Sequence, residues 1–177
     1  MPTPGDDDRL AELGAALAQR IVDAVPGWVV GETARVLDAW LASPGAPPAA
    51  PGERDAVLAT AAEAGRRAAS ALAPALGALL AADVDEQTVT PLQLVRELVR
   101  FPAAVLQAAS VPPVVRDPSD EERFPDDRYG LVPASLASLD PDLRQPALTW
   151  GAAKALAHLR RHGAAGRPTG DDAPDVH

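Results

Sequence analysis

Residues 90–109 read TPLQLVRELVRFPAAVLQAA, and this stretch carries the clearest helical signal in the chain. Thr90 is a favourable N-cap, the proline after it suits the first helical position, and Gln93 completes a capping box. The apolar residues that follow recur at three- and four-residue spacing, which predicts an amphipathic helix. Pro102 predicts a kink in that helix after Phe101.

Three further helices are expected on the N-terminal side of this stretch. Residues 8–25 and 28–41 both have helical periodicity and are separated by Pro26–Gly27, so we expect an antiparallel hairpin of two helices. A third helix should begin at Glu53, and Pro74 should kink or split it. Small residues on this third helix would allow another helix to approach closely. They are Ala61, Ala62, Gly65, Ala68, Ala69, Ala73 and Gly77.

On the C-terminal side, residues 111–133 read VPPVVRDPSDEERFPDDRYGLVP and predict a long acidic, Pro-rich loop. Connections longer than about 12–15 residues without secondary structure are either functional or disordered. A disordered linker does not need apolar anchors, and this segment contains six of them. They are Val114, Val115, Phe124, Tyr129, Leu131 and Val132. We therefore expect an ordered loop.

Beyond the loop, we expect a short helix over residues 133–139 and a last helix whose long part begins at Pro146 and ends at His162. The residues that this last helix is expected to bury are Leu148, Ala152, Ala155, Leu156 and Leu159. Residues 166–177 are expected to form a disordered acidic tail. The fold expected for residues 1–165 is a single all-α domain, an irregular bundle of about five main helices with one long ordered loop.

Composition agrees with this fold and excludes several classes of function. The chain has 177 residues, a formal net charge of -9 and no cysteine. Thiol catalysis, disulfide scaffolds and cysteine-ligated metals are therefore excluded, and general nucleic-acid binding is disfavoured. An acidic start, without the pattern of an export signal, predicts a cytoplasmic protein, and the preference for Arg over Lys indicates a bacterial one. The uncharged stretch between Arg67 and Asp83 is shorter than the ~20 apolar residues that a bilayer requires, so no membrane insertion is expected.

No motif in the sequence establishes a reaction. Phosphate-binding loops and the nucleophile elbow are absent. His158 and His162 have the spacing of a metal pair, but the basic residues beside them are typical of an ordinary helix C-terminus. The carboxylates of residues 117–127 could supply a general acid and base, although such clusters are usually solvated. We expect no metal, no cofactor and no catalytic residue.

The charge pattern along the chain is more informative. Residues 117–127 contain six carboxylates and one arginine, whereas residues 143–170 contain basic residues and no acid. The loop could therefore fold onto the last helix through ion pairs. Alternatively, the basic helix could meet an anionic partner through Trp150, Lys154, His158 and Arg161, which recur at helical spacing, unless Trp150 packs in the core.

Two functional hypotheses follow. The first is a non-enzymatic adaptor or regulatory module that binds a protein partner or a second copy of itself through residues 111–133 and the last helix. The alternative is an enzyme or small-ligand receptor with a pocket between the bundle and the loop. A helical transcription regulator fits less well, because the N-terminal hairpin is acidic. The candidate binding residues are Arg100, Arg116, Phe124, Asp126, Asp127, Tyr129, Trp150, Lys154, His158 and Arg161.

Overall fold

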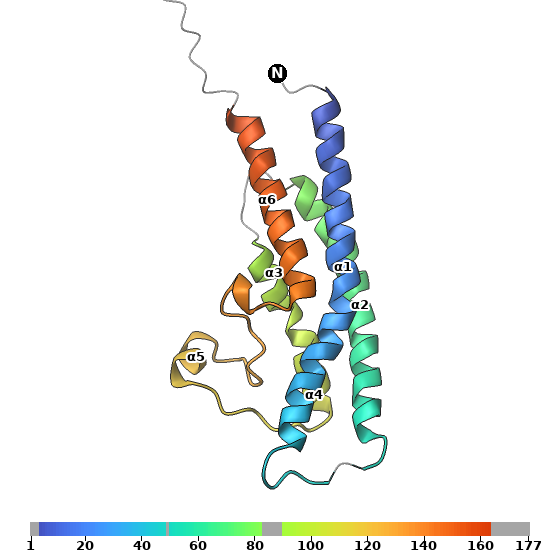
Figure 1. The fold of residues 1–177 in the computed structure, drawn as a ribbon, viewed down its shortest axis with the longest axis vertical. Helices are drawn as coiled ribbons and strands as arrows, with labels where there is room; N and C mark the ends of the chain where they lie inside the picture. Colours follow the sequence, from blue (N-terminus) through green and yellow to red (C-terminus); the bar gives the residue numbers. More distant parts are fainter. Residues whose placement is uncertain (1–3, 49, 83–89, 164–177) are drawn as a thin grey trace, which may run out of the picture.

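The computed structural model describes residues 4–48, 50–82 and 90–163, which contain helices and no strand (Figure 1). The bundle helices are α1 (Pro4–Leu41), α2 (Glu53–Ala82), α3 (Pro91–Leu98), α4 (Arg100–Ala108) and α6 (Pro141–Gly163). Between α4 and α6 lie a short helix, α5 (Pro118–Arg123), and a 3-10 turn, η1 (Leu136–Ser138). The predicted all-α bundle is confirmed. The predicted tail, residues 166–177, lies outside the described residues.

The two longest helices, α1 and α2, run antiparallel and pack along each other, and the other bundle helices are arranged around this pair (Figure 1). Helix α4 packs against both of them, and α6 runs beside α1 and contacts α3. The chain between α4 and α6, including α5, projects to one side of this bundle. The fold therefore places the segment 111–133 against the flank of α1, α3 and α4.

Helix α1 is continuous, so the predicted hairpin of two helices is wrong. Pro26 lies inside the helix, where it removes one backbone hydrogen bond and clashes with the preceding turn, at a cost of about 3 kcal/mol. The residues around it are deeply buried: Val25 and Val29 are 0% exposed. Burial of such side chains stabilises by about 1.5–3 kcal/mol each. Packing on both sides of Pro26 therefore outweighs the local cost.

Close packing of α2 against α1 depends on Gly65. A Cβ atom at this position would lie 2.8 Å from the Cα of Pro26, which is shorter than real Cβ contacts allow. Ala61 and Ala68, one turn away on either side, are 0% and 1% exposed. The predicted use of small residues for close helix approach is confirmed at Ala61, Gly65 and Ala68, whereas Ala73 and Gly77 are exposed and do not contribute to it. Pro74 does not split α2, which continues to Ala82.

Helix α3 begins as the sequence predicts. The Thr90 hydroxyl accepts the Gln93 amide at 3.2 Å, and the Gln93 side chain accepts the Thr90 amide at 3.1 Å. The interruption caused by Pro102 lies at Val99, earlier than the predicted kink after Phe101. Because proline cannot donate to the carbonyl four residues before it, the helix is interrupted on the N-terminal side of the proline.

The end of α4 directs the chain into the long loop. The amide of Ser110 donates to the Gln107 carbonyl, and the amide of Val111 donates to the Leu106 carbonyl, both at 3.0 Å. This is the hydrogen-bond pattern of a Schellman motif, which requires a left-handed residue after the helix. Ser110 occupies that position with a φ of 57°. Val111 is 3% exposed and fixes the start of the loop in the core.

Helix α6 differs from its prediction at its start and in its buried face. It begins at Pro141 and continues through Pro146, and the predicted helix over residues 133–139 is reduced to the single turn η1. Its core side chains include Leu143 and Trp150, each 1% exposed. All five residues predicted to be buried, Leu148, Ala152, Ala155, Leu156 and Leu159, are exposed. The helix has two apolar stripes, and the bundle covers the other one.

None of the described helices contains a stretch long and apolar enough to cross a bilayer.

Candidate functional site

The segment 111–133 is an ordered loop held by polar contacts of its own. Asp117 caps α5 by accepting the Ser119 amide at 2.9 Å and the Ser119 hydroxyl at 2.6 Å. These two hydrogen bonds, first the hydroxyl and then the amide, hold the pKa of Asp117 below its ordinary value. Four of the six predicted anchors pack on the core: Val114, Tyr129, Leu131 and Val132. Val115 is 100% exposed, so its prediction as an anchor is wrong.

A buried ion pair organises the loop. The side chains of Arg116 and Asp127 are 10% and 6% exposed, with 4.0 Å between the closest nitrogen and oxygen. Asp127 also accepts the amides of Leu131 and Val132 at 2.9 and 2.8 Å. Arg116 donates to the Phe124 carbonyl at 2.9 Å. Both charges are therefore committed to the architecture of the loop.

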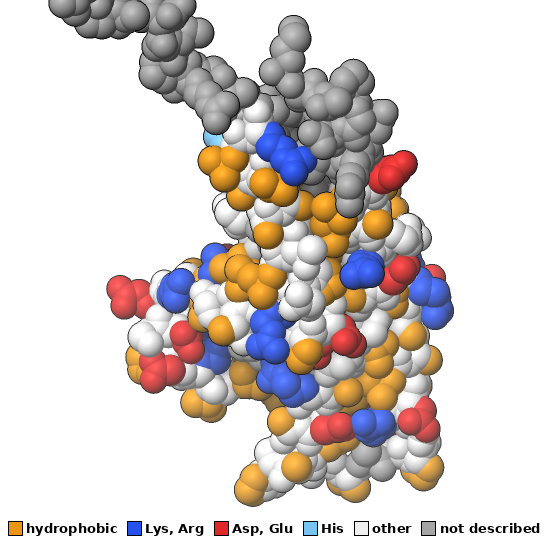
Figure 2. Space-filling view, turned by 45° about the horizontal axis from the view of Figure 1, so that its top comes forward, with side chains coloured by type: hydrophobic (Ala, Val, Ile, Leu, Met, Phe, Trp, Pro, Cys, Tyr) orange, Lys and Arg blue, Asp and Glu red, His pale blue; other side chains and the backbone are white. Residues whose placement is uncertain are grey.

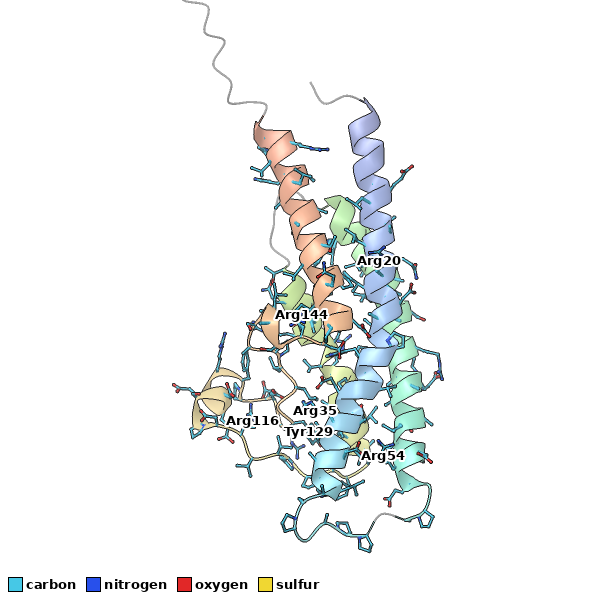
Figure 3. The ribbon with its side chains drawn as sticks, viewed as in Figure 1. Arg20, Arg35, Arg54, Arg116, Tyr129 and Arg144 are labelled. Carbon is cyan, nitrogen blue, oxygen red and sulfur yellow. The ribbon has the colours of Figure 1, made fainter. Side chains whose placement is uncertain are left out.

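Tyr129 ties the two ends of the loop together. Its hydroxyl donates to the Val111 carbonyl at 3.0 Å, and its side chain is 2% exposed. The adjacent Gly130 has a φ of 61° and offers its carbonyl to Arg35 of α1 at 3.2 Å. Figure 3 shows Tyr129 and Arg35 close together beside the lower half of α1, with Arg116 toward α5. The loop is thus fastened to α1 near the C-terminal end of that helix.

Arginines on opposite elements enclose Phe124. The guanidinium carbons of Arg96 and Arg123 lie 5.2 and 5.0 Å from the Phe124 ring centroid, within the range of cation–π attraction. Arg96 also donates to the carbonyls of Pro133 and Ala134, at 3.1 and 3.2 Å. These contacts connect α3 to the far end of the loop. The loop therefore contacts α3 at two places, Phe124 and Pro133.

Between these contacts the loop leaves a half-open groove of about 440 Å³. Its walls are α3 and α4 on one side and residues 123–132 on the other. The apolar lining comes from Val99, Ala103, Phe124, Pro125, Leu131 and Val132, and the charged lining from Arg96, Arg100, Arg123, Arg128, Asp126 and Asp127. Its volume falls within the ~300–1,000 Å³ typical of small-molecule sites. We call this space the loop groove.

The electrostatic character of the loop groove is opposite to that of the whole chain. Four arginines line it against two aspartates, one of which, Asp127, is already paired. None of the four arginines forms an ion pair with a carboxylate in the described parts of the chain. Each wall carries two of them, Arg96 and Arg100 on the helices and Arg123 and Arg128 on the loop.

A second hollow, of about 370 Å³, lies on the opposite side of the loop, against the C-terminal half of α1. Arg35, Arg116 and Asp120 line it. Arg35 is paired with Glu32 at 2.9 Å, and Arg116 is committed to the loop as described above. This hollow therefore offers fewer uncommitted charged groups than the loop groove.

Five of the ten predicted binding residues come together in the loop groove. They are Arg100, Phe124, Asp126, Asp127 and Tyr129. Arg116 lies behind it as a support of the loop. The sequence reasoning missed Arg96, Arg123 and Arg128, which look like solvated charges beside acidic neighbours. The one available signal was the position of Arg96 four residues before Arg100, on the same side of the expected helix.

The remaining candidates lie on α6. Trp150 is 1% exposed and takes the core role that the sequence left open, with Lys154 6.0 Å from its ring centroid. The rings of His158 and His162 lie 4.6 Å apart. The side chain of Arg161 lies outside the described part of the structure. A docking stripe that includes Trp150 therefore loses its aromatic member.

The five ion pairs identified among the described residues include none between the loop and α6, so the predicted ion pairing between them is not among these contacts. Of the ion pairs there, only that between Arg116 and Asp127 involves the loop, and it is internal to it. The loop packs against α1, α3 and α4, and Figure 2 shows acidic and basic side chains interspersed over the projecting region at the left. The carboxylates of the loop are therefore neutralised locally or solvated.

No group of three His, Asp or Glu side chains within the described residues is arranged to hold a metal ion. Comparisons with protein-family models, with curated proteins and with solved structures each find no match. The assignment of a function therefore rests on the geometry of the loop groove.

Proposed function

We propose that this protein is a non-catalytic receptor that binds a small ligand in the loop groove. The observation that carries the proposal is the construction of the loop: a buried ion pair and a buried tyrosine fix its conformation, and a groove of about 440 Å³ lies between residues 123–132 and the helices α3 and α4. Preformed, partly apolar hollows with a few convergent polar groups are the usual form of ligand sites.

Binding is favoured over catalysis because the groups suited to chemistry have structural roles. Asp127 accepts two backbone amides, and the Tyr129 hydroxyl donates to a carbonyl. Asp126 is exposed and has no hydrogen-bonding side-chain partner among the described residues. A general acid and base must lie within reach of the reacting group and have a suitable pKa. In the loop groove, Asp127 and the Tyr129 hydroxyl are engaged in hydrogen bonds that hold the loop, which supports binding over catalysis.

A fragment screen monitored by amide NMR shifts tests this proposal. We expect hits whose shifts cluster on Val99, Leu131 and Val132. Ala103→Trp should abolish these shifts because the indole fills the groove, whereas Ala104→Trp, on the exposed side of the same helix, should leave them unchanged. Hits that persist in Ala103→Trp, or a screen without hits in this region, would contradict a ligand site here.

Self-association is the second candidate function, and the exposed stripe of α6 favours it. Leu148, Leu156 and Leu159 are 46%, 44% and 65% exposed, and hydrophobic side chains reach the surface toward the C-terminal end of this helix (Figure 2). With Ala152 and Ala155 they repeat at three- and four-residue spacing, which an identical stripe could complement. Light scattering should then give a dimer for the native chain and a monomer for Leu159→Glu. A monomeric native chain excludes this candidate.

A further inference from the structure

The chemical class of the ligand can be inferred from the charges that line the loop groove, and this inference rests on the proposed ligand site. Arg100 and Arg128 lie on opposite walls, and neither side chain has a hydrogen-bonded or ion-paired partner in the described structure. The guanidinium carbon of Arg100 lies 5.1 Å from the ring centroid of Phe101. Two guanidinium groups are therefore available on facing sides of one hollow.

The other two arginines are already held in place. Arg96 and Arg123 both stack on Phe124 and both reach the Ala134 carbonyl, at 3.2 and 3.5 Å. Because their hydrogen bonds go to neutral carbonyls, their positive charge is not cancelled by a carboxylate. A guanidinium that is fixed in this way loses less entropy when it binds an anion. The fixed pair adds positive potential to a site where the available pair can form hydrogen bonds.

The remaining lining is apolar and comes from both walls. Val99 and Ala103 face the loop from the helices, and Leu131 and Val132 face them from the loop. A purely inorganic anion would leave this surface unused. A ligand with an apolar body would bury it, at roughly 25 cal/mol for each Å² removed from water.

We infer that the loop groove binds a small amphipathic anion, in which a carboxylate or phosphate head group meets Arg100 and Arg128 and an apolar body lies against the aliphatic lining. Carboxylate and phosphate groups each present two oxygens that a guanidinium group can bind through paired hydrogen bonds. The whole chain has a net charge of -9, so this arginine-lined groove is a local exception to its acidic character.

Calorimetric titration with four probes of equal chain length tests this inference. The probes are octanoate, octyl phosphate, octanol and octylammonium, and inorganic phosphate serves as the head group alone. Charge-assisted hydrogen bonds should make at least one of the two amphipathic anions bind about tenfold or more tightly than octanol. The comparison of octanoate with octyl phosphate identifies the preferred head group. Inorganic phosphate should bind more weakly than either amphipathic anion.

Variants show whether the arginines cause the preference. Arg100→Gln with Arg128→Gln should reduce anion affinity to that of octanol and leave octanol binding unchanged. Arg66→Gln is the matched control, because Arg66 is an exposed α2 arginine paired with Glu63 at 2.7 Å and lies outside the groove. Octanol or octylammonium binding as tightly as the anions would overturn the inference while leaving the ligand site intact. Binding of none of the probes, together with a fragment screen without hits, would overturn both.

Discussion

The loop 111–133 and helix α6 are the two regions whose charges look complementary in the sequence, yet they are stabilised in different ways. The loop combines its apolar anchors with buried polar groups: Asp127 alone accepts hydrogen bonds from two amides and faces Arg116. Helix α6 is held by apolar burial, with Leu143 and Trp150 each 1% exposed. Within the loop only Asp127 pairs with an arginine, and the other five carboxylates of residues 117–127 are exposed, so solvent can satisfy them without the helix. Complementary net charge between two segments therefore does not predict contact between them.

The largest loss of stability is expected from a substitution among the buried side chains of α6. Leu143→Ala removes a fully buried side chain and should lower the free energy of unfolding by about 3–4 kcal/mol. Leu156→Ala, on the exposed stripe of the same helix, should change it by less than about 0.5 kcal/mol. Urea denaturation followed by circular dichroism measures both. Equal losses for the two variants would mean that the stripe is also covered.

Removal of the Asp127 carboxylate from the loop should lower the stability of the protein almost as much. Asp127→Ala leaves the amides of Leu131 and Val132 without their acceptor and the buried Arg116 without its counter-charge, and should lower the free energy of unfolding by about 3 kcal/mol. Asp126→Ala is the adjacent control and should cost less than about 0.5 kcal/mol, because Asp126 is exposed. A small loss for Asp127→Ala would show that the loop does not depend on this pair.

The bundle was largely predictable where local chemistry decides the structure. Thr90 and Gln93 form the predicted capping box, and the small residues of α2 allow the predicted close approach. The continuity of α1 through Pro26 was not predictable, because it depends on burial against α2 that a local cost cannot reveal. The count of five main helices is nevertheless correct, since one predicted hairpin became α1 and one predicted helix became α3 and α4.

The candidate site was predictable in part. The apolar anchors indicate an ordered loop, and the sequence places Arg100 and Asp126 among the candidate binding residues. The sequence could not distinguish Asp126 from Asp127, which are neighbours with different roles, because their roles depend on which amides the folded loop presents. Helix α6 shows the same limit: it has two apolar stripes, and only its partners determine which one is buried.

A smaller effect is expected where the loop is closed by one neutral hydrogen bond. Tyr129→Phe removes the donor to the Val111 carbonyl and should lower the free energy of unfolding by about 1 kcal/mol. Thr149→Val on α6 removes a hydroxyl that bonds within its own helix and remains partly exposed, so it serves as the comparison and should cost less. A negligible loss for Tyr129→Phe would remove the tyrosine hydroxyl from the polar scaffold of the loop.

The smallest effect should appear in acid, and only in the loop. Hydrogen bonds from Ser119 lower the pKa of Asp117, so the stabilisation they give is present above the ordinary aspartate pKa and is lost as the pH falls through the lowered value. As the pH falls, the protection of backbone amides from hydrogen exchange, relative to an unfolded chain, should therefore be lost in α5 before it is lost in the core of α6. Ser119→Ala should raise the Asp117 pKa, measured by carboxyl NMR titration, and leave unchanged the lowered pKa of Asp38, which depends on Arg54. An unchanged Asp117 pKa in that variant would contradict this account of how α5 is capped, because both the depressed pKa and the cap depend on the same Ser119 contacts.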